Sequence, residues 1–138
     1  MIVIDASVWV SFFVQQDVNH TSTKTWVIKT LSARVPIAAP NLLLAEVGGA
    51  ISRRLGSANI GNKVINQLFS VPTLHLVSID HTLAIQASRI AAKHQLRGAD
   101  AIYIAVAADL NIPLISWDRE QNTRASSLVN TYTPQSAP

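Results

Sequence analysis

Four acidic side chains stand where an α/β protein could place an active site. Asp5 and Asp118 each follow a short apolar run. Asp100 lies in the first turn of a predicted helix, and Glu46 lies early in another. If the four met, their negative charges would repel one another and raise each other's pKa unless a cation neutralised them. The chain has no Cys, and its four His residues lack metal-ligand spacing, so the donors would be oxygens. Such donors favour Mg²⁺, with Mn²⁺ as a second possibility.

Two of the residues at the first apolar run also have simpler possible roles. Asp5 could act only as the N-cap of the helix that follows it. The hydroxyl of Ser7 could bind a water molecule or a phosphate oxygen, or it could cap the same helix. Both pairs of alternatives are open at the level of sequence.

The elements that would position these residues alternate between strands and helices. Short apolar runs predict strands at residues 2–4, 35–39, 73–77, 113–117 and 129–132. Helical spacing of apolar residues predicts helices at 8–14, 19–33, 41–55, 57–70, 81–94, from the turn at 96–100 to about 110, and at 119–127. This alternation predicts an α/β fold, with three α/β/α layers around a central, mostly parallel sheet of four to five strands.

The order of the strands decides whether the acids meet. Right-handed crossovers would carry the first three strands outward on one side and return the fourth beside the first. Asp5 and Asp118 would then lie about 5–10 Å apart at the carboxyl edge of the sheet, where open α/β sheets bind ligands. Four of only eight acidic residues in a chain of net charge +3 would converge there.

The predicted helix that carries Glu46 has one unusual feature. Asn41 is a candidate N-cap and Gly56 a stop signal. Between them stand Gly48 and Gly49, each of which costs about 0.5–1 kcal/mol relative to Ala inside a helix. A close approach of another backbone would explain them, and so would simple local weakness.

Length and composition set the class of protein. The 138 residues suit a single domain, expected at 1–132, with a frayed tail at 133–138. The absence of Cys excludes disulfides and thiolate zinc sites. No signal peptide and no membrane-spanning run is recognisable, so we expect a cytoplasmic protein. The net positive charge suits an anionic partner such as nucleic acid. Charged residues make up only 14%, against about 25% in typical domains, which suggests that a partner or a second copy covers apolar surface.

Four segments together resemble the PIN-domain ribonucleases, and most closely the VapC-type toxins of toxin–antitoxin pairs. The segments are residues 2–7, with the opening strand and Asp5; 41–47, with Glu46; 96–105, with Asp100; and 113–118, with Asp118. The third segment is the most specific, and the motifs stand in the family's order over nearly the whole chain. Ser116 stands where the family commonly has Thr, and Gly48 and Gly49 loosen the helix behind Glu46.

The resemblance implies a magnesium-dependent endoribonuclease with a PIN-like fold. Asp5, Asp100 and Asp118 would hold one or two Mg²⁺ ions, and Glu46 would complete the ligand shell or orient the attacking water. Such relatives act as toxins of type II toxin–antitoxin systems, so the expected partners are an RNA substrate, a cognate antitoxin and a second copy in a homodimer, with no membrane. The apolar early helices fit both the dimer and the antitoxin contact.

Four arginines are candidates for gripping RNA phosphates: Arg53, Arg54, Arg97 and Arg119. For any one of them taken alone, an ordinary solvated side chain is the favoured interpretation. Two other functions stay open, namely a non-catalytic PIN-like module that binds RNA or protein, and a housekeeping RNA-processing nuclease. A dehalogenase-like phosphatase is disfavoured because its chemistry needs a second Asp where Ser7 stands.

Overall fold

A computed structural model describes all 138 residues, and a five-stranded parallel sheet forms its centre. The strand order is β3-β2-β1-β4-β5, so the fourth strand does return beside the first, as predicted. Every pair of neighbouring strands is parallel. The strands are β1 (Ile2–Ile4), β2 (Ile37–Pro40), β3 (Leu74–Val77), β4 (Leu114–Ile115) and β5 (Thr131–Tyr132).

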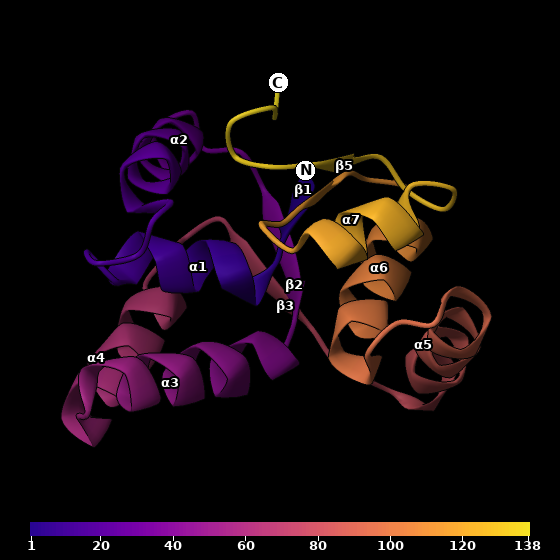
Figure 1. The fold of residues 1–138 in the computed structure, drawn as a ribbon, viewed down its shortest axis with the longest axis horizontal. Helices are drawn as coiled ribbons and strands as arrows, with labels where there is room; N and C mark the ends of the chain where they lie inside the picture. Colours follow the sequence, from indigo (N-terminus) through magenta and orange to yellow (C-terminus); the bar gives the residue numbers. More distant parts are fainter.

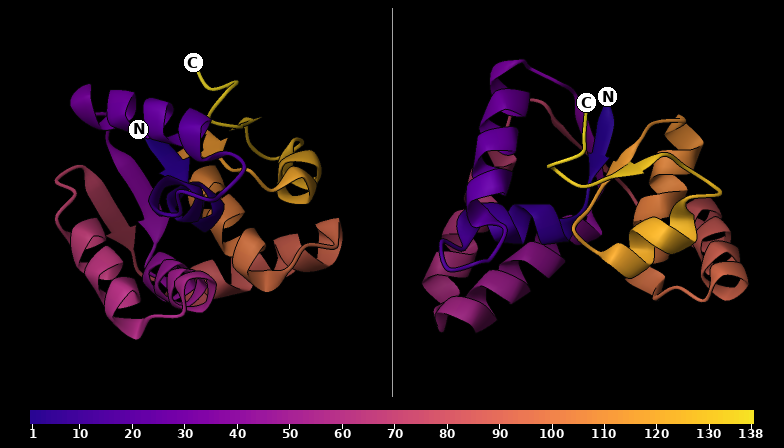
Figure 2. Two further views of the ribbon diagram at one scale, coloured as in Figure 1. Left: turned by 60° about the vertical axis from the view of Figure 1, so that its left-hand side comes forward. Right: turned by 45° about the horizontal axis from the view of Figure 1, so that its top comes forward.

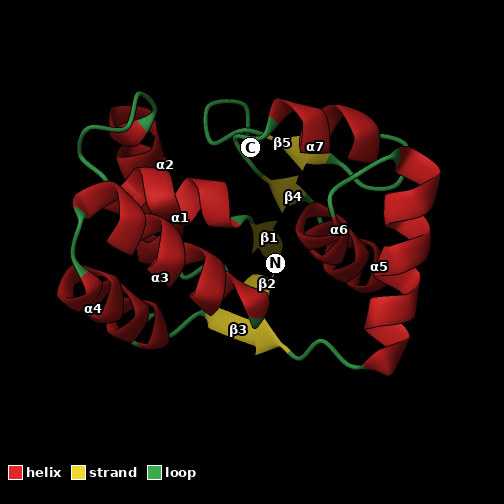
Figure 3. Ribbon diagram, turned by 60° about the horizontal axis from the view of Figure 1, so that its bottom comes forward, coloured by secondary structure: helices red, strands yellow, loops and turns green.

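Helices cover both faces of this sheet and complete the expected α/β/α arrangement. Figure 3 shows α1 to α4 on one side of the strands and α5 to α7 on the other. Their bounds are α1 (Ala6–Phe13), α2 (His20–Ser32), α3 (Leu42–Leu55), α4 (Ala58–Phe69), α5 (His81–His94), α6 (Gly98–Leu110) and α7 (Arg119–Ala125). None of these helices has the length and apolar character needed to cross a bilayer.

The sheet is buried at its centre, which fixes the strands that carry the acids. Every residue of β2 is buried, as are Val3 and Ile4 of β1 and both residues of β4. Helix α6 packs on this centre with a run of fully or nearly fully buried residues, 103–107. Burying a large apolar side chain contributes about 1.5–3 kcal/mol, so this core holds the sheet edge in place.

Most strand and helix ends differ from the prediction by one or two residues, and three positions show a local cause or contact. The fourth strand is shorter than residues 113–117, because Trp117 donates its backbone N–H to Ser7 Oγ (3.1 Å) and leaves the sheet. Pro40, expected to stop the second strand, is instead its last residue and pairs with Val77. Asn41 precedes α3 but its side chain makes no capping hydrogen bond.

The two glycines in α3 have different surroundings. A Cβ added to Gly48 would lie 2.6 Å from Ile65 Cδ1, and one added to Gly61 would lie 2.9 Å from Gly48 O. Close packing of α3 against α4 therefore explains Gly48. A Cβ on Gly49 would meet only the Arg53 side chain, at 3.3 Å, so no backbone approach requires glycine there.

Residues 133–136 form a hydrogen-bonded turn after β5. The backbone N–H of Thr133 donates to Ser136 Oγ at 3.0 Å, and Pro134 is buried. The tail runs back toward α2 (Figure 2), where Gln135 Nε2 donates to Ser22 Oγ.

Candidate active site

Asp5 and Asp118 lie on either side of one buried hydroxyl at the carboxyl edge of the sheet. Parallel pairing of Ile4 with Ile115 places the ends of β1 and β4 next to each other. Ser116 Oγ, fully buried, donates to Asp5 Oδ2 at 3.2 Å and accepts from the backbone N–H of Asp118 at 3.0 Å. The predicted adjacency of the two strands that precede these acids is confirmed.

The simpler role considered for Asp5 is real as well. Asp5 Oδ2 accepts a hydrogen bond from Ser7 N at 2.9 Å and so caps α1. Ser7 does not cap the helix itself. Its hydroxyl accepts from Trp117 N and lies 3.3 Å from Ser116 Oγ, which ties the start of α1 to the end of β4. Asp5 Oδ1 makes no hydrogen bond within the protein and is not among the enclosed polar atoms.

Glu46 reaches the same edge from α3 and is met there by a side chain of α6. Tyr103 donates its hydroxyl proton to Glu46 Oε2 at 2.7 Å. Burial raises the pKa of Glu46, and the negative charges of Asp5 and Asp100 raise it further, while the Tyr103 hydrogen bond opposes them. The pKa of Tyr103 is raised by its burial and by Glu46, so its proton stays on the hydroxyl.

Asp100 and Asp118 are joined by an arginine. Arg97 donates from Nε to Asp100 Oδ2 at 3.1 Å and from Nη2 to Asp118 Oδ2 at 2.8 Å. Asp118 also caps α7, since its Oδ1 accepts from Gln121 N. Burial raises the pKa of Asp100, and Asp118 and Asp5 add to this, whereas Arg97 lowers it. The acids are therefore close enough for the charge of one to raise the pKa of another.

The donor set fits a hard divalent cation, although the side chains are not closed around one. One oxygen on each of three acids makes no hydrogen bond within the protein and is not enclosed: Asp5 Oδ1, Glu46 Oε1 and Asp100 Oδ1. Carboxylate oxygens are the ligands that Mg²⁺ and Mn²⁺ prefer. However, no three acidic, histidine or cysteine side chains lie close enough together to hold a metal as they stand.

A cleft of about 630 Å³ opens beside the acids. Its lining includes the acids Glu46 and Asp118 and the basic residues Arg53 and Arg54. Its walls come from α1 and α3, which run side by side (Figure 1). The cleft thus offers a negatively charged polymer both acidic and basic side chains.

The four predicted phosphate-binding arginines have unequal surroundings. Arg53 lines the cleft and Arg119 follows Asp118, and both are exposed without an ion pair. Arg54 is paired with Asp17 at 2.8 Å. Arg97 is paired with two of the acids themselves. Only Arg53 and Arg119 are thus available to a ligand without breaking a contact.

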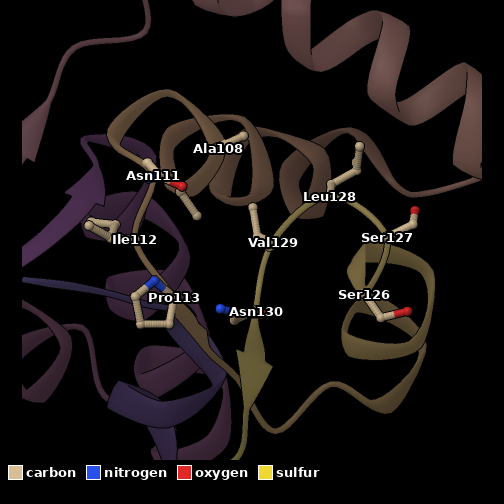
Figure 4. Close-up of a pocket in the computed structure, with 10 residues that line it drawn as sticks. Ala108, Asn111, Ile112, Pro113, Ser126, Ser127, Leu128, Val129 and Asn130 are labelled. Atoms are coloured by element: carbon tan, nitrogen blue, oxygen red, sulfur yellow. The ribbon is translucent and has the colours of Figure 1, made fainter.

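Another hollow lies at the opposite ends of the strands. It is bounded by the end of α6 and the segment 126–130, and Figure 4 shows Asn111, Pro113 and Asn130 around it. No charged side chain lines it. It therefore lacks the carboxylates and the basic side chains that are present at the acidic edge of the sheet.

Sequence reasoning did not assign a site role to Tyr103, Ser116 or the bridging contacts of Arg97. A signal existed for Tyr103, for Ser116 and for one contact of Arg97. Tyr103 follows Asp100 by three residues on one helix, which places both on one face. Ser116 precedes Asp118 by two residues at a strand end, where alternate residues share a side. For Arg97, the same spacing of three residues indicates its contact with Asp100, whereas its contact with Asp118 has no such signature.

Comparisons with known proteins agree with this geometry. The family model described as PIN domain matches residues 2–126. VapC20 of Mycobacterium tuberculosis, described as a Sarcin-Ricin loop cleaving toxin, has a TM-score of 0.75 at 19% identity over 89% of this chain and 94% of its own. FitAcB from Neisseria gonorrhoeae has a TM-score of 0.71 at 19% identity over 98% and 99%. A toxin–antitoxin complex from Klebsiella pneumoniae gives 0.66 at 15% over 99% and 100%. No curated protein matches the sequence.

Proposed function

This chain belongs to the PIN-domain family, and from that membership and its acidic site we propose that it is a metal-dependent endoribonuclease. It hydrolyses phosphodiester bonds in RNA and acts as the toxin of a type II toxin–antitoxin system. The observation that carries the proposal is the placement of Asp5, Glu46, Asp100 and Asp118 near one sheet edge, beside a cleft whose lining includes Arg53 and Arg54.

The four carboxylates would hold the ion. Asp5, Asp100 and Asp118 are the proposed ligands of Mg²⁺, or of Mn²⁺, and Glu46 completes the set. When bound, such an ion lowers the pKa of a water ligand and offsets negative charge on the phosphate oxygens. The free oxygens on three of the acids and their mutual repulsion support this assignment.

The protein's own residues supply orientation and proton transfer. Ser116 and the start of α1 fix the direction of the Asp5 carboxylate. Tyr103 fixes Glu46 by Oε2 and leaves Oε1 free, so that Glu46 either completes the ligand set or accepts a proton from the attacking water. A carboxylate with a raised pKa is the better base for that transfer. Arg53 and Arg119 are proposed to bind RNA phosphates on either side of the cut.

The proposed partners follow from the relatives and from exposed apolar surface. One matched structure is a toxin–antitoxin complex, which supports an antitoxin partner for this chain. Val18 and Phe69 are 94% and 63% exposed, so apolar side chains on the α1–α4 side are available to an antitoxin or to a second copy in a homodimer. The site of action would be the cytoplasm, where RNA and antitoxin are made.

Thermal unfolding measured at increasing Mg²⁺ concentrations tests whether the protein binds a metal ion. Binding to the native state alone adds about 2.7 kcal/mol at a concentration of 100 Kd, so the Tm of the wild type should rise by several degrees. Asp100→Asn should abolish the rise. Asp109→Asn is the matched control, because Asp109 lies exposed near the other end of the same helix and should keep the rise.

Cleavage of RNA by the same proteins tests the proposed activity. Asp5→Asn should lose activity with the fold intact, and activity at the full wild-type rate would remove this site from the reaction. The competing function is a non-catalytic module that binds RNA or protein. It is favoured by the Arg97 bridge, which already neutralises part of the site without metal. That function predicts neither a Mg²⁺ shift nor cleavage.

A further inference from the structure

We propose that Arg97 is an exchangeable internal cation. It bridges Asp100 and Asp118 while no metal is bound, and it passes to a substrate phosphate when a divalent ion takes its place. The inference rests on the proposed function, because it concerns how the same site changes between its metal-free and RNA-bound states. It adds a positioning residue whose role is distinct from that of the four acids.

The bridge uses two different nitrogens of one planar group. Nε lies 3.1 Å from Asp100 Oδ2 and Nη2 lies 2.8 Å from Asp118 Oδ2, so the guanidinium spans the two carboxylates. These acids come from the first turn of α6 and the N-cap of α7, two helix ends that are also joined by a hydrogen bond from Gln121 Nε2 to the carbonyl oxygen of Asp100 at 3.3 Å. The guanidinium of Arg97 holds two carboxylates near each other that would otherwise repel.

The bridge is placed to be broken easily. The Arg97 side chain is 73% exposed, whereas those of Asp100 and Asp118 are 18% and 24% exposed. Exposed ion pairs contribute little to stability and are screened by salt. One guanidinium also cannot neutralise Asp100 and Asp118 together with the nearby charges of Asp5 and Glu46, so the site retains a negative charge that attracts a divalent ion.

A released Arg97 has an acceptor within reach when RNA is bound. Asp118, to which it is bonded, lines the cleft beside the acids. The guanidinium fork matches the oxygens of a phosphate as well as those of a carboxylate. When the Arg97 side chain moves away from Asp100 and Asp118, these carboxylates become available to the ion. The same movement brings the guanidinium to a phosphate of the substrate.

A purely structural ion pair and an exchangeable cation predict different effects of Arg97→Gln. If the ion pairs of Arg97 are purely structural, their loss would let the carboxylates of Asp100 and Asp118 move apart. Metal and nucleic acid would then both bind more weakly. Loss of an exchangeable cation removes a competitor for the carboxylates, so metal binds more tightly. It also removes a phosphate contact, so nucleic acid binds more weakly. The two affinities then change in opposite directions.

The experiment measures both affinities on the full chain. Calorimetric titration with Mn²⁺ in the absence of RNA should give a Kd for Arg97→Gln that is roughly 2- to 30-fold lower than that of the wild type, as expected for removing two exposed ion pairs. Fluorescence anisotropy with a labelled 2′-O-methyl RNA dodecamer of mixed sequence, in saturating Mn²⁺, should show weaker binding by Arg97→Gln.

Arg119→Gln is the matched control, since it removes an exposed guanidinium beside Asp118 that forms no ion pair. Its Kd for Mn²⁺ should stay within about twofold of the wild type, as for a surface charge with weak coupling.

If Arg97→Gln and Arg119→Gln gained the same affinity for Mn²⁺, the effect would be one of net charge alone, and the proposal that Arg97 exchanges with the ion would be overturned. Weaker or unchanged Mn²⁺ binding by Arg97→Gln, or RNA binding no weaker than that of the wild type, would overturn it too. If the wild type binds no Mn²⁺ at all, the proposed function fails with it, whereas equal binding by wild type and Arg97→Gln removes only the role of Arg97.

Discussion

Tyr103 Oη donates a 2.7 Å hydrogen bond to Glu46 Oε2 and so connects α6 with α3 across the edge of the sheet. Tyr103 is fully buried, and Glu46 is half-buried with a raised pKa. A neutral donor fixed by the core thus directs a carboxylate that has little water around it. A hydrogen bond to a charged group contributes about 1.5–3 kcal/mol, which makes this contact a substantial part of how Glu46 is held.

Tyr103→Phe should disturb the site more than the fold. Removing the hydroxyl leaves Glu46 without its donor, so we expect RNA cleavage to fall by about 10- to 100-fold, the equivalent of one hydrogen bond to a charged group. Cleavage rates and urea denaturation of the same samples separate the two effects. Tyr132→Phe is the control, since the Tyr132 hydroxyl makes no hydrogen bond and lies in β5. Equal loss in both variants would mean that Glu46 is held by something else.

Stability should depend on pH through Glu46 in the metal-free protein. Its pKa is raised in the folded state, so the native protein binds more protons than the unfolded chain between the ordinary value of 4.5 and the raised value. The contribution of Glu46 to the free energy of unfolding therefore falls as the pH rises through that window. Glu46→Gln keeps an acceptor for Tyr103 but carries no charge. It should be more stable than the wild type at pH 7, and the difference should vanish on acidification.

Thermal melts in EDTA at several pH values measure this difference directly. Other titrating groups, including Asp17 with its lowered pKa, are common to both proteins and cancel. Glu120→Gln provides the control, because it removes an exposed carboxylate from α7 that pairs with Arg124. A gap between wild type and Glu46→Gln that stays constant from neutral to acid pH would contradict the assigned cause.

Two glycine substitutions should change stability in opposite directions. A Cβ at position 61 would lie 2.9 Å from Gly48 O, a backbone atom that can move only if α3 and α4 separate. We therefore expect Gly61→Ala to lose about 1–3 kcal/mol, as overpacked sites do. Gly49→Ala meets only the movable end of Arg53 at 3.3 Å and should gain about 0.5–1 kcal/mol. Equilibrium denaturation in urea compares them, and a shared sign would contradict the packing argument.

RNA binding should weaken with salt, and single arginines should set part of the slope. Each phosphate contact to a single strand contributes about 0.7 to the slope of log K against log salt. Arg53→Gln should lower the slope by about this amount, because Arg53 lines the cleft and has no ion pair. Arg89→Gln, in the exposed face of α5, should leave it unchanged. A flat salt response of the wild type would remove all the proposed phosphate contacts.

The sequence by itself determined the elements and their order. Apolar runs and helical spacing predicted every strand and helix to within a few residues. They could do so because the buried face of each element shows in the spacing of its apolar residues. The handedness of parallel crossovers then placed the fourth strand beside the first, and with it Asp118 beside Asp5. Where the prediction erred, at Trp117 and Asn41, a hydrogen bond made or not made at the end of the element decided its bounds.

Only the tertiary structure decided how the charges are arranged. Two explanations of Gly48 were open until α4 was seen to lie against it, and the roles of Asp5 and Ser7 could not be divided until the end of β4 was in place. Whether Arg97 points to solvent or bridges two acids depends on a contact between residues on different helices. Spacing along a chain fixes which face a residue shares with its neighbours. It does not fix which partner a long, flexible side chain meets in space, because several partners of similar energy are in reach until packing selects one.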